Sequence, residues 1–362
     1  MAQSGNFEGQ RVLLIDRAAK DSNDRTWCFW EEGGGFFDGI VHRSWAKAWF
    51  HDDGFSKLLD LSPYRYKMIR GIDFYDHCRR VLSDHPQFMF RHAGIDRLEN
   101  GPDLVRVHAD GATLTAPYVY SSLMPDMASA QPRYHHLLQH FKGWVIETEK
   151  PSFNPAEATL MDFRPSQQHG TTFVYVMPFT EHRALVEYTL FSPSLLDDAR
   201  YEEGLTRYVG SVLGIDAYTV VEKEFGVIPM TDRPFPARSG RILHIGTAGG
   251  NTKASTGYTF QFIQKQAAAI VHSLEKTGDP FRIPFKQGRR FSWYDSVLLH
   301  ILTHHKLEGH DVFRMLFQRN EPSSIFRFLD NDSTIPGEAK LMNTLPMLPF
   351  LKAGLRELPK MF

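Results

Sequence analysis

The order of hydrophobic and polar positions predicts an α/β arrangement at the start of the chain. Residues 11–16 (RVLLID) form a continuous apolar run that ends in an acid, which is typical of a buried parallel strand. Residues 74–82 are predicted to form a helix, and short strands are predicted around 88–91 and 104–107. Strands and a helix therefore alternate in this part of the chain.

The middle of the chain predicts a β hairpin. Residues 171–177 and 184–190 are rich in β-branched and aromatic side chains, and a turn is predicted between them at 178–183. An antiparallel sheet after an α/β start suggests an inserted substrate domain. The 362 residues contain no internal repeat or long linker, so we expect two interleaved domains, or one large α/β domain with an appendage.

A strand, a loop of small residues and a long helix are predicted to follow one another at 241–278. The apolar stripe of the helix comprises Phe262, Ile263, Ala267, Ile270, Val271 and Leu274, and Gly278 is expected to end it. A glycine loop before a helix can present backbone N–H groups to an anion or a cofactor edge, although a purely structural turn has the same pattern. The candidate cofactor ligands in this loop are Gly246, Ala248, Gly249, Gly250, Thr256 and Gly257.

The last part of the chain combines amphipathic helices with positive charge. Residues 281–362 hold twelve Lys or Arg against eight Asp or Glu, and Ser292 with Asp295 resembles a helix capping box. Apolar faces are predicted at 293–302 and 312–317, and the Pro-broken segment 345–351 is also apolar. Two interpretations remain open: ordinary helix packing, and docking on an anionic membrane surface.

Composition excludes several classes of protein. The formal net charge of −1 argues against nucleic-acid binding, and two cysteines allow neither a disulfide framework nor a four-thiolate zinc site. The high aromatic content, with 28 Phe and 6 Trp, points to a large apolar ligand. No signal peptide and no membrane-spanning run is recognised, so the sequence predicts a soluble or peripheral intracellular protein.

Glu187 is the carboxylate that the sequence singles out for chemistry. Strand alternation places it on the same face as Leu185 and Thr189. If that face is buried, desolvation raises the pKa of Glu187 and makes it a competent acid or base. If the face is exposed, Glu187 is a solvated strand residue.

Asp16 is a candidate ligand for a ribose, because an acid at the tip of the second strand has that role in dinucleotide-binding folds. A plain strand with a solvated Asp explains the same pattern. The Gly-x-Gly-x-x-Gly turn that belongs before such a strand does not occur in the ten residues before Arg11. Either the ribose interpretation is wrong, or the chain begins too late.

Two further groups of residues were considered for binding. Arg25 lies in the segment 24–30 (DRTWCFW), whose aromatic residues could pack under a flavin or line an apolar channel. Seventeen histidines include the doublets 135–136 and 304–305, but adjacent residues point in different directions, so no metal site is predicted. Motifs of serine hydrolases and of nucleotide triphosphatases are absent from the sequence.

Taken together and in order, five segments resemble the bacterial lycopene β-cyclases. The resemblance runs from about Arg11 to about Asp330. Its segments are residues 24–30 (DRTWCFW), 173–179 (FVYVMPF), 185–189 (LVEYT), 226–231 (GVIPMT) and 249–258, which contains Gly249-Gly250 and STGY. Each motif is modest alone, and their combination and order are highly specific.

The resemblance implies a flavoprotein fold, a cofactor and a reaction. The fold is the FAD-binding, Rossmann-like, three-layer α/β fold of the glutathione-reductase and hydroxylase flavoenzymes, with an inserted antiparallel substrate sheet and a helical C-terminal part. The cofactor is reduced FAD, used without net redox change, with NAD(P)H as the reductant. The reaction closes the ψ ends of lycopene and related C40 carotenoids into β-ionone rings. The family's first signature glutamate, considered catalytic, matches Glu187, whereas its second acid is Tyr188 here.

The same resemblance predicts domain limits and a location. Residues 1–70 and 220–280 are expected to form the FAD domain, 71–219 the mixed region with the substrate sheet, and 281–362 a helical, basic, membrane-contacting region. Lycopene resides in the bilayer, so a peripheral position at the cytoplasmic face of the membrane is expected. Family members carry a first strand and glycine turn before the strand at 11–16, and we expect this chain to be a truncated product. A redox-active flavoenzyme on a carotenoid or prenyl substrate and an inactive carotenoid-binding fragment are the alternatives.

Overall fold

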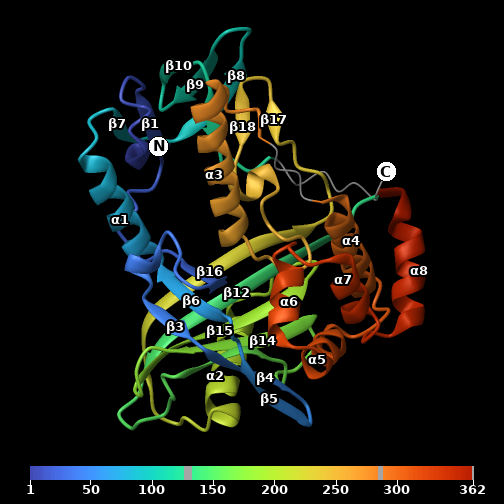
Figure 1. The fold of residues 1–362 in the computed structure, drawn as a ribbon. Helices are drawn as coiled ribbons and strands as arrows, with labels where there is room; N and C mark the ends of the chain where they lie inside the picture. The colour runs from blue at the N-terminus through green and yellow to red at the C-terminus, as the bar shows by residue number, and fades with distance from the viewer. Residues whose placement is uncertain (126–132, 284–287, 361–362) are drawn as a thin grey trace.

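A large sheet crosses the middle of the molecule in Figure 1, with small sheets above it and the C-terminal helices at the right. The computed structural model describes residues 1–125, 133–283 and 288–360. The small sheets lie at the top of Figure 1 beside the helices α1 (Gly71–Ser83) and α3 (Phe260–Thr277). The fold is α/β, with a large, mostly antiparallel sheet and a helical C-terminal part, as the sequence predicts.

The large sheet has seven strands in the order β16-β12-β15-β14-β13-β4-β5. In this order the strands are Thr219–Thr231, His136–Glu147, Arg183–Ser192, Thr171–Pro178, Glu157–Asp162, Lys47–Asp52 and Phe55–Asp60. Neighbours are antiparallel except β13 and β4, which are parallel. The predicted hairpin is confirmed as β14 and β15, in which Tyr175 is paired with Glu187.

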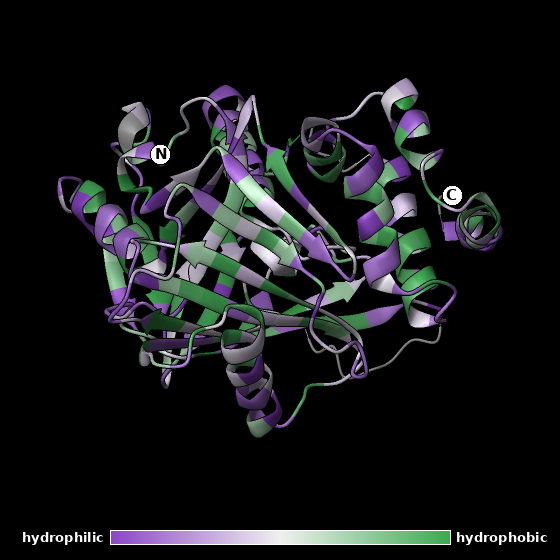
Figure 2. Cartoon of the chain, turned by 90° about the horizontal axis from the view of Figure 1, so that it is seen from below, coloured by the Kyte–Doolittle hydropathy of each residue, from purple (hydrophilic) through white to green (hydrophobic). Residues whose placement is uncertain are grey.

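The two faces of this sheet are both buried, but against different partners. On one face, alternate residues such as Val186 and Tyr188 pack on α2 (Asp198–Arg207) and the π-helical turn Tyr208–Val212. The other face carries Tyr175 and Leu185 and joins the main hydrophobic core. That core also takes in the sheet β2-β6-β3, formed by Thr26–Glu32, Tyr64–Arg70 and Arg43–Trp45. Hydrophobic colouring follows the strands of the central sheet in Figure 2.

The remaining strands form three small sheets. β1 (Val12–Asp16) pairs in parallel with β7 (Phe88–His92), and β11 (Val119–Ser121) pairs in parallel with β18 (Ile242–His244). β17 (Arg238–Ser239) adds to β18, and β8 (Ile95–Asn100), β9 (Val105–Ala109) and β10 (Ala112–Ala116) form a meander. Ile15 of β1 and Ile242 of β18 share a hydrophobic cluster although their strands are not hydrogen-bonded.

Three local predictions require correction. β1 is expected to be buried, but Leu13 and Leu14 are exposed, because among the described strands only β7 pairs with it. The long helix begins at Phe260 rather than at Thr256, because Gly257 has a φ of 73° and breaks the helical path; it ends at Gly278 as predicted. Within its stripe, Ala267 is exposed and Gln266 is buried instead.

The C-terminal helices are α4 (Arg289–Thr303), α5 (Gly309–Arg319), α6 (Pro322–Leu329), α7 (Ile335–Met342) and α8 (Met347–Glu357). The predicted capping box is wrong: Gly288 is the N-cap of α4, and Asp295 binds Lys253 and Ser255 inside the protein. The apolar faces of α4 and α5 are largely buried in the core. α8 differs, because Met347, Leu348, Leu351 and Leu355 are all more than half exposed.

The predicted domain limits remain a prediction, but strand pairing crosses them. β4 and β5 lie within 1–70, and β16 begins at Thr219 beside the second predicted FAD segment. All three belong to the large sheet with β12, β14 and β15. None of the described helices is long and apolar enough to cross a membrane.

Candidate active site

Glu187 lies at the centre of the large sheet, on the face that joins the main core. Only 8% of the residue is exposed, and its neighbours on the same face, Leu185 and Thr189, are buried as well. Thr189 Oγ1 donates a 3.0 Å hydrogen bond to Glu187 Oε1. Burial and the nearby charge of Glu224 raise the pKa of Glu187 well above its usual range, because a desolvated carboxylate is disfavoured. The buried alternative for Glu187 is therefore confirmed.

Tyr188, which stands where the family has a second acid, points away from Glu187. It belongs to the opposite face of the sheet and packs against α2, where a Cβ on Gly204 would lie 2.7 Å from the Tyr188 ring. Successive strand residues face opposite sides of a sheet. A carboxylate at position 188 would thus lie with α2 rather than with the buried acid.

A second carboxylate nevertheless meets Glu187, and it comes from another strand. Gly143 of β12 is paired with Glu187 on one side and with Glu224 of β16 on the other. The two acids therefore flank this glycine, and Glu224 is close enough for its charge to raise the pKa of Glu187. Sequence analysis missed Glu224, although Glu222 and Glu224 alternate along the strand that leads into the motif at 226–231.

Aromatic and sulfur-containing side chains enclose the two acids. Tyr175 and Tyr258 approach each other with 3.4 Å between their hydroxyl oxygens, and Cys28 Sγ lies 3.3 Å from Met177 Sδ. Burial raises the pKa of the Cys28 thiol and of the Tyr258 hydroxyl, so these groups are neutral at physiological pH. The surroundings are therefore uncharged and largely apolar, which suits a reaction that passes through a carbocation.

The segment 24–30 contributes its two faces to different contacts. Thr26 Oγ1 donates a 2.7 Å hydrogen bond to Glu224 Oε2, and Trp30 packs edge-on against Tyr258 with ring centroids 4.3 Å apart. Phe29, on the other face, packs on Phe260 at the start of α3, with centroids 4.6 Å apart. The strand thus connects the acids with the region of the predicted cofactor loop.

The predicted cofactor residues of the glycine loop lie together between β18 and α3. Gly246, Ala248 and Gly249 form a short 3₁₀ turn that Gly250 ends with a φ of 76°. A Cβ on Gly249 would lie 2.2 Å from the His244 carbonyl oxygen, so only glycine fits there. The loop returns at Thr256 and Gly257, where a Cβ on Gly257 would lie 2.1 Å from Gln139 Oε1 of β12.

This loop fits the edge of a cofactor. Thr256 is 3% exposed, and its Oγ1 has no hydrogen-bond partner within the described residues. A buried hydroxyl without a partner is costly, and a ligand atom would satisfy it. Tyr258 follows in sequence and contacts Tyr175 on the face of Glu187, so the loop and the acid are adjacent in the fold.

Asp16 and Arg25 lie near each other at the end of β1. Lys20 lies 3.5 Å from Asp16 and 3.7 Å from Asp24, and Arg25 forms a 3.0 Å ion pair with Asp24. Asp16 is exposed at the carboxyl end of a parallel strand, which is the position expected for a ribose ligand. Arg25 is partly exposed and lies beside Trp27. Their roles as cofactor ligands stay predictions.

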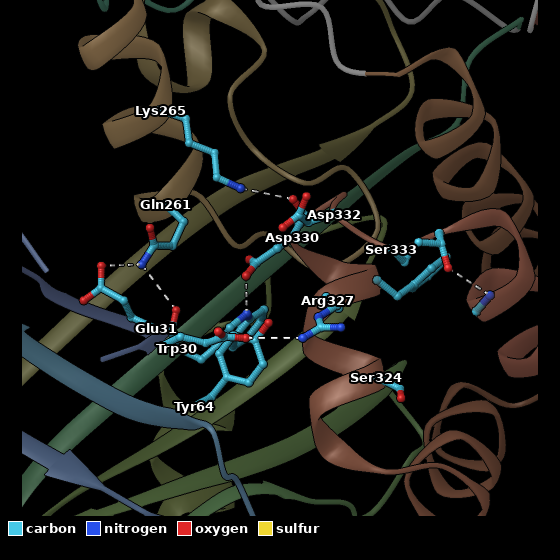
Figure 3. A pocket seen from close by; sticks show the side chains of 14 residues that line it. Trp30, Glu31, Tyr64, Gln261, Lys265, Ser324, Arg327, Asp330, Asp332 and Ser333 are labelled. Carbon is cyan, nitrogen blue, oxygen red and sulfur yellow. Dashed lines mark hydrogen bonds and ion pairs between the residues drawn. The ribbon is translucent and has the colours of Figure 1, made fainter. Parts of the chain in front are cut away.

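Two cavities differ in their relation to the acids. The larger, about 550 Å³, lies between Trp30, Gln261 and α6, and its lining includes Lys265, Arg327 and Asp330 (Figure 3). Burial raises the pKa of Asp330 to about 6, and the Trp30 indole N–H donates a 2.8 Å hydrogen bond to it. This charged lining does not suit a hydrocarbon. The smaller cavity, about 180 Å³, is lined by Gly143, Leu185 and Glu224 and therefore reaches the carboxyl pair.

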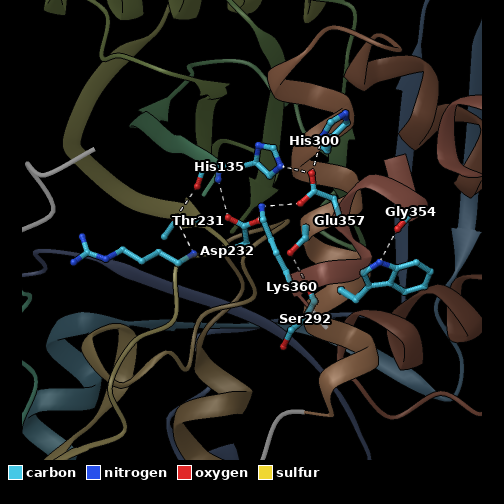
Figure 4. Close-up of polar contacts among 11 residues, drawn as sticks. His135, Thr231, Asp232, Ser292, His300, Gly354, Glu357 and Lys360 are labelled. Atoms are coloured by element: carbon cyan, nitrogen blue, oxygen red, sulfur yellow. Dashed lines mark hydrogen bonds and ion pairs between the residues drawn. The ribbon is translucent and has the colours of Figure 1, made fainter. Parts of the chain in front are cut away.

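Three histidines come together at the base of α8. His135, before β12, lies 3.0 Å from Glu357 Oε1, and His300 lies 2.7 Å from the same oxygen (Figure 4). His304 stacks on His300. The sequence interpretation considered adjacent doublets and missed the pair four residues apart on α4. Lys360 forms a 2.7 Å ion pair with Glu357 and thus supplies the cation of this cluster. The prediction that the protein holds no metal is not tested by this arrangement.

Comparisons with known proteins show the family and the fold. The sequence model described as "Lycopene cyclase protein" matches residues 1–355. A lycopene beta-cyclase from Paracoccus sp. is 29% identical over 212 residues, which are 52% of this chain and 47% of that protein. The match thus spans about half the length of that curated relative.

Solved structures with low sequence identity share the fold. A geranylgeranyl bacteriochlorophyll reductase-like protein from Thermoplasma acidophilum has a TM-score of 0.57 at 12% identity, covering 100% of this chain and 95% of its own. CtdE in complex with FAD and a substrate has a TM-score of 0.56 at 10% identity, covering 99% and 96%. The fold is therefore that of FAD-dependent enzymes, and the family match over nearly the whole sequence shows that this chain belongs to the lycopene cyclase family.

Proposed function

We propose that this protein cyclises the ψ end groups of lycopene and related C40 carotenoids to β-ionone rings by acid–base chemistry. The observation that carries the proposal is the buried carboxyl of Glu187, whose pKa burial raises well above its usual range, in an uncharged aromatic environment. An acid strong enough to protonate an alkene must be shielded from water, which would otherwise capture the cation. The family to which the chain belongs supports the same chemistry.

The proposed reaction adds one proton to the end group of the substrate and removes another proton from it. Glu187 gives its proton to the terminal C1=C2 alkene, which leaves a tertiary cation at C1. The electron pair of the C5=C6 alkene then forms the C1–C6 bond, and the cation moves to C5. The C6–H bond then breaks, its electrons form the C5=C6 double bond of the β ring, and a carboxylate takes the proton. The product is an isomer of the substrate, so no oxidant or reductant is consumed.

The residues of the glycine loop would hold the flavin edge in this proposal. Thr256 offers a buried hydroxyl, and Gly249 and Gly257 let the backbone approach closely. When bound, reduced FAD would supply negative charge near the developing cation. NAD(P)H is the proposed reductant. Asp16 and Arg25 complete the proposed cofactor contacts at the end of β1.

The proposal extends to the membrane. A C40 hydrocarbon resides in the bilayer, so the enzyme has to work at its surface. α8 presents Met347, Leu348, Leu351 and Leu355 to solvent, with the exposed cations Lys352 and Arg356 beside them. Such a helix suits an interface with anionic lipid. The proposed location is the cytoplasmic face of a bacterial membrane, with the protein bound peripherally.

The experiment is pigment chromatography of lycopene-accumulating bacteria that express this chain or its Glu187→Gln variant. We expect γ-carotene or β-carotene from the chain as given, and a loss of about 10²–10⁴-fold with Glu187→Gln, because a general acid contributes that much. Glu181→Gln, an exposed residue in the turn before β15, is the control and should retain activity.

Two results would contradict the cyclase proposal. The first is unchanged lycopene in cells that contain folded protein. The second is net consumption of oxygen or of NAD(P)H with each turnover, which would favour a redox-active flavoenzyme on a carotenoid or prenyl substrate.

A further inference from the structure

The geometry around Gly143 forces two acids together in the interior. Neighbouring strands lie roughly 4.8 Å apart, so Glu187 and Glu224, two strands apart, are separated by about 10 Å at their backbones. A Cβ at Gly143 would lie 2.8 Å from Glu224 Cγ and 3.0 Å from both Glu224 Oε1 and Leu185 Cδ1, so the Glu224 side chain extends over the glycine. The absent side chain at position 143 therefore leaves room for Glu224 to approach the strand that carries Glu187.

Each acid is held by one threonine, which leaves one oxygen for the other acid. Thr189 bonds Glu187 Oε1, and Thr26 bonds Glu224 Oε2. Glu224 Oε1 is buried and has no donor among the described residues. Two carboxylate oxygens cannot share a site without a proton between them, because both would be acceptors and both charged.

No cation in the described structure neutralises the pair. Glu222, two residues before Glu224, forms a 2.6 Å ion pair with Arg183, but neither Glu187 nor Glu224 forms an ion pair within the described residues. Burial raises the pKa of both acids, and the charge of Glu224 raises that of Glu187 further. Because two neighbouring buried carboxylates repel each other, the pair retains a proton more readily than an isolated carboxyl group would.

The two acids face different surroundings. Glu187 lies towards the neutral groups Cys28, Tyr66, Tyr175 and Tyr258. Glu224 lines the cavity of about 180 Å³. The polar and charged residues that share this cavity with Glu224 are Asn23, Thr26, His42, Arg43, Arg70, Thr180, Arg183, Glu222 and Lys223. Glu224 therefore stands between the apolar interior and a polar cavity.

We propose that Glu224 is a positioning residue that shares a single proton with Glu187 across Gly143, and that the cavity beside Glu224 is the route by which this proton exchanges with solvent. The inference rests on the proposed cyclase function and adds a second acid to it. Glu224 acts through Glu187 and does not contact the substrate.

The shared proton closes the catalytic cycle. When the O–H bond of Glu187 breaks and a C–H bond forms at C2, both acids become carboxylates, and their two charges lie beside the cation. The C6–H bond then breaks, its electrons form the ring alkene, and the proton returns to the pair. Exchange through the cavity labels this proton, so turnover in D₂O should place one deuterium in each new ring.

The test compares Glu224→Gln with the exposed control Glu181→Gln. Infrared spectroscopy of the purified protein without substrate should show a protonated carboxyl at pH 7 that disappears in Glu187→Gln. In Glu224→Gln the pH at which this carboxyl ionises should fall by about one unit or more, because the neighbouring charge is gone. The alkaline limb of kcat/KM for lycopene should move by the same amount. Glu181→Gln should move neither.

A second variant tests the same proposal if Glu224→Gln fails to fold. Gly143→Ala retains both acids but inserts a methyl group between them, and it should lower the ionisation pH in the same direction. Identical ionisation in Glu224→Gln and in the parent protein would overturn the proposal. If the infrared result holds but lycopene is never cyclised, the shared proton stands and the cyclase function fails.

Discussion

At the scale of single residues, a buried polar atom without a hydrogen-bond partner indicates a position where a ligand atom can bind. Thr256 Oγ1 is buried without a partner among the described residues, and it lies in the loop that fits a cofactor edge. By contrast, Lys253 is fully buried but satisfied, with ion-pair and hydrogen-bond contacts to Asp295 and Asn331 of 2.8 and 2.9 Å. An apolar substitution is therefore expected to lower the free energy of unfolding at Lys253 but not at Thr256.

Thr256→Val should stabilise the protein without flavin or leave it unchanged, because it replaces an unpaired hydroxyl with a methyl group of similar size. FAD affinity should fall by about tenfold, the value of one hydrogen bond of 1–1.5 kcal/mol. Thermal unfolding and flavin fluorescence titration measure the two effects separately. Equal FAD affinity in both proteins would show that the hydroxyl does not contact the flavin. Thr252→Val, whose hydroxyl already bonds Thr247, is the control.

Lys253→Met should lower the free energy of unfolding by about 3–5 kcal/mol, because it leaves Asp295 buried without its cation. Adding Asp295→Leu should recover much of this loss, and urea unfolding measures both variants. Lys265→Met removes an exposed lysine and should change stability by less than about 0.5 kcal/mol. A single variant as stable as the parent would show that the pair contributes nothing.

At the scale of elements, α8 combines a firmly held inner face with an apolar outer face. Its inner face contacts α4 through the Trp293 indole N–H, which donates a 3.1 Å hydrogen bond to the Gly354 carbonyl oxygen, and through Glu357, which lies 2.7 Å from His300. Its outer face exposes four large apolar side chains. Because its inner face is held by α4, α8 can bind a lipid surface through its outer face and stay packed on the protein.

Leu351→Glu with Leu355→Glu should abolish or strongly reduce binding to anionic lipid vesicles, while the protein stays folded because both positions are exposed. Vesicle co-sedimentation measures the binding, and circular dichroism checks the fold. Leu195→Glu, an exposed leucine just before α2, is the matched control. Undiminished binding by the double variant would place the lipid contact elsewhere.

At the scale of the whole molecule, burial of titratable groups sets the response to acid. Among the described residues, six histidines have a lowered pKa, chiefly because burial disfavours their charged form: His42, His51, His140, His244, His300 and His304. The unfolded chain takes up these protons first as pH falls below about 6.5, so acid favours unfolding. Glu187, Glu224 and Asp330 oppose this, because their raised pKa values let the folded protein bind protons.

The histidines outnumber the opposing acids, so the free energy of unfolding should fall by roughly 1–2 kcal/mol per pH unit between about 6.5 and 5. Burial lowers the pKa of His140 to about 4, and His140→Gln should therefore flatten this slope. Urea unfolding at a series of pH values measures it. A stability that rises steadily as the pH falls through this window would show that the acids dominate.

Local chemistry could be predicted from the sequence because it depends on neighbours along the chain. The alternation around Glu187 predicted its face, the β14–β15 hairpin followed from two β-rich runs, and Gly278 ends α3 as expected. The glycine loop was recognised in the same way. The start of α3 was misplaced because the left-handed φ of Gly257 is set by contact with β12.

What only the tertiary structure decided is which distant residues share an interior position. Glu224 lies 37 positions from Glu187 and meets it because both strands flank β12, where Gly143 leaves room for two side chains. Likewise His135 meets α4 and α8 across more than 150 residues. No local sequence pattern predicts strand order and register, because both depend on how the faces of many elements are buried together. The sequence determined the chemical identity of the first acid, and the packing of the sheet provided the second.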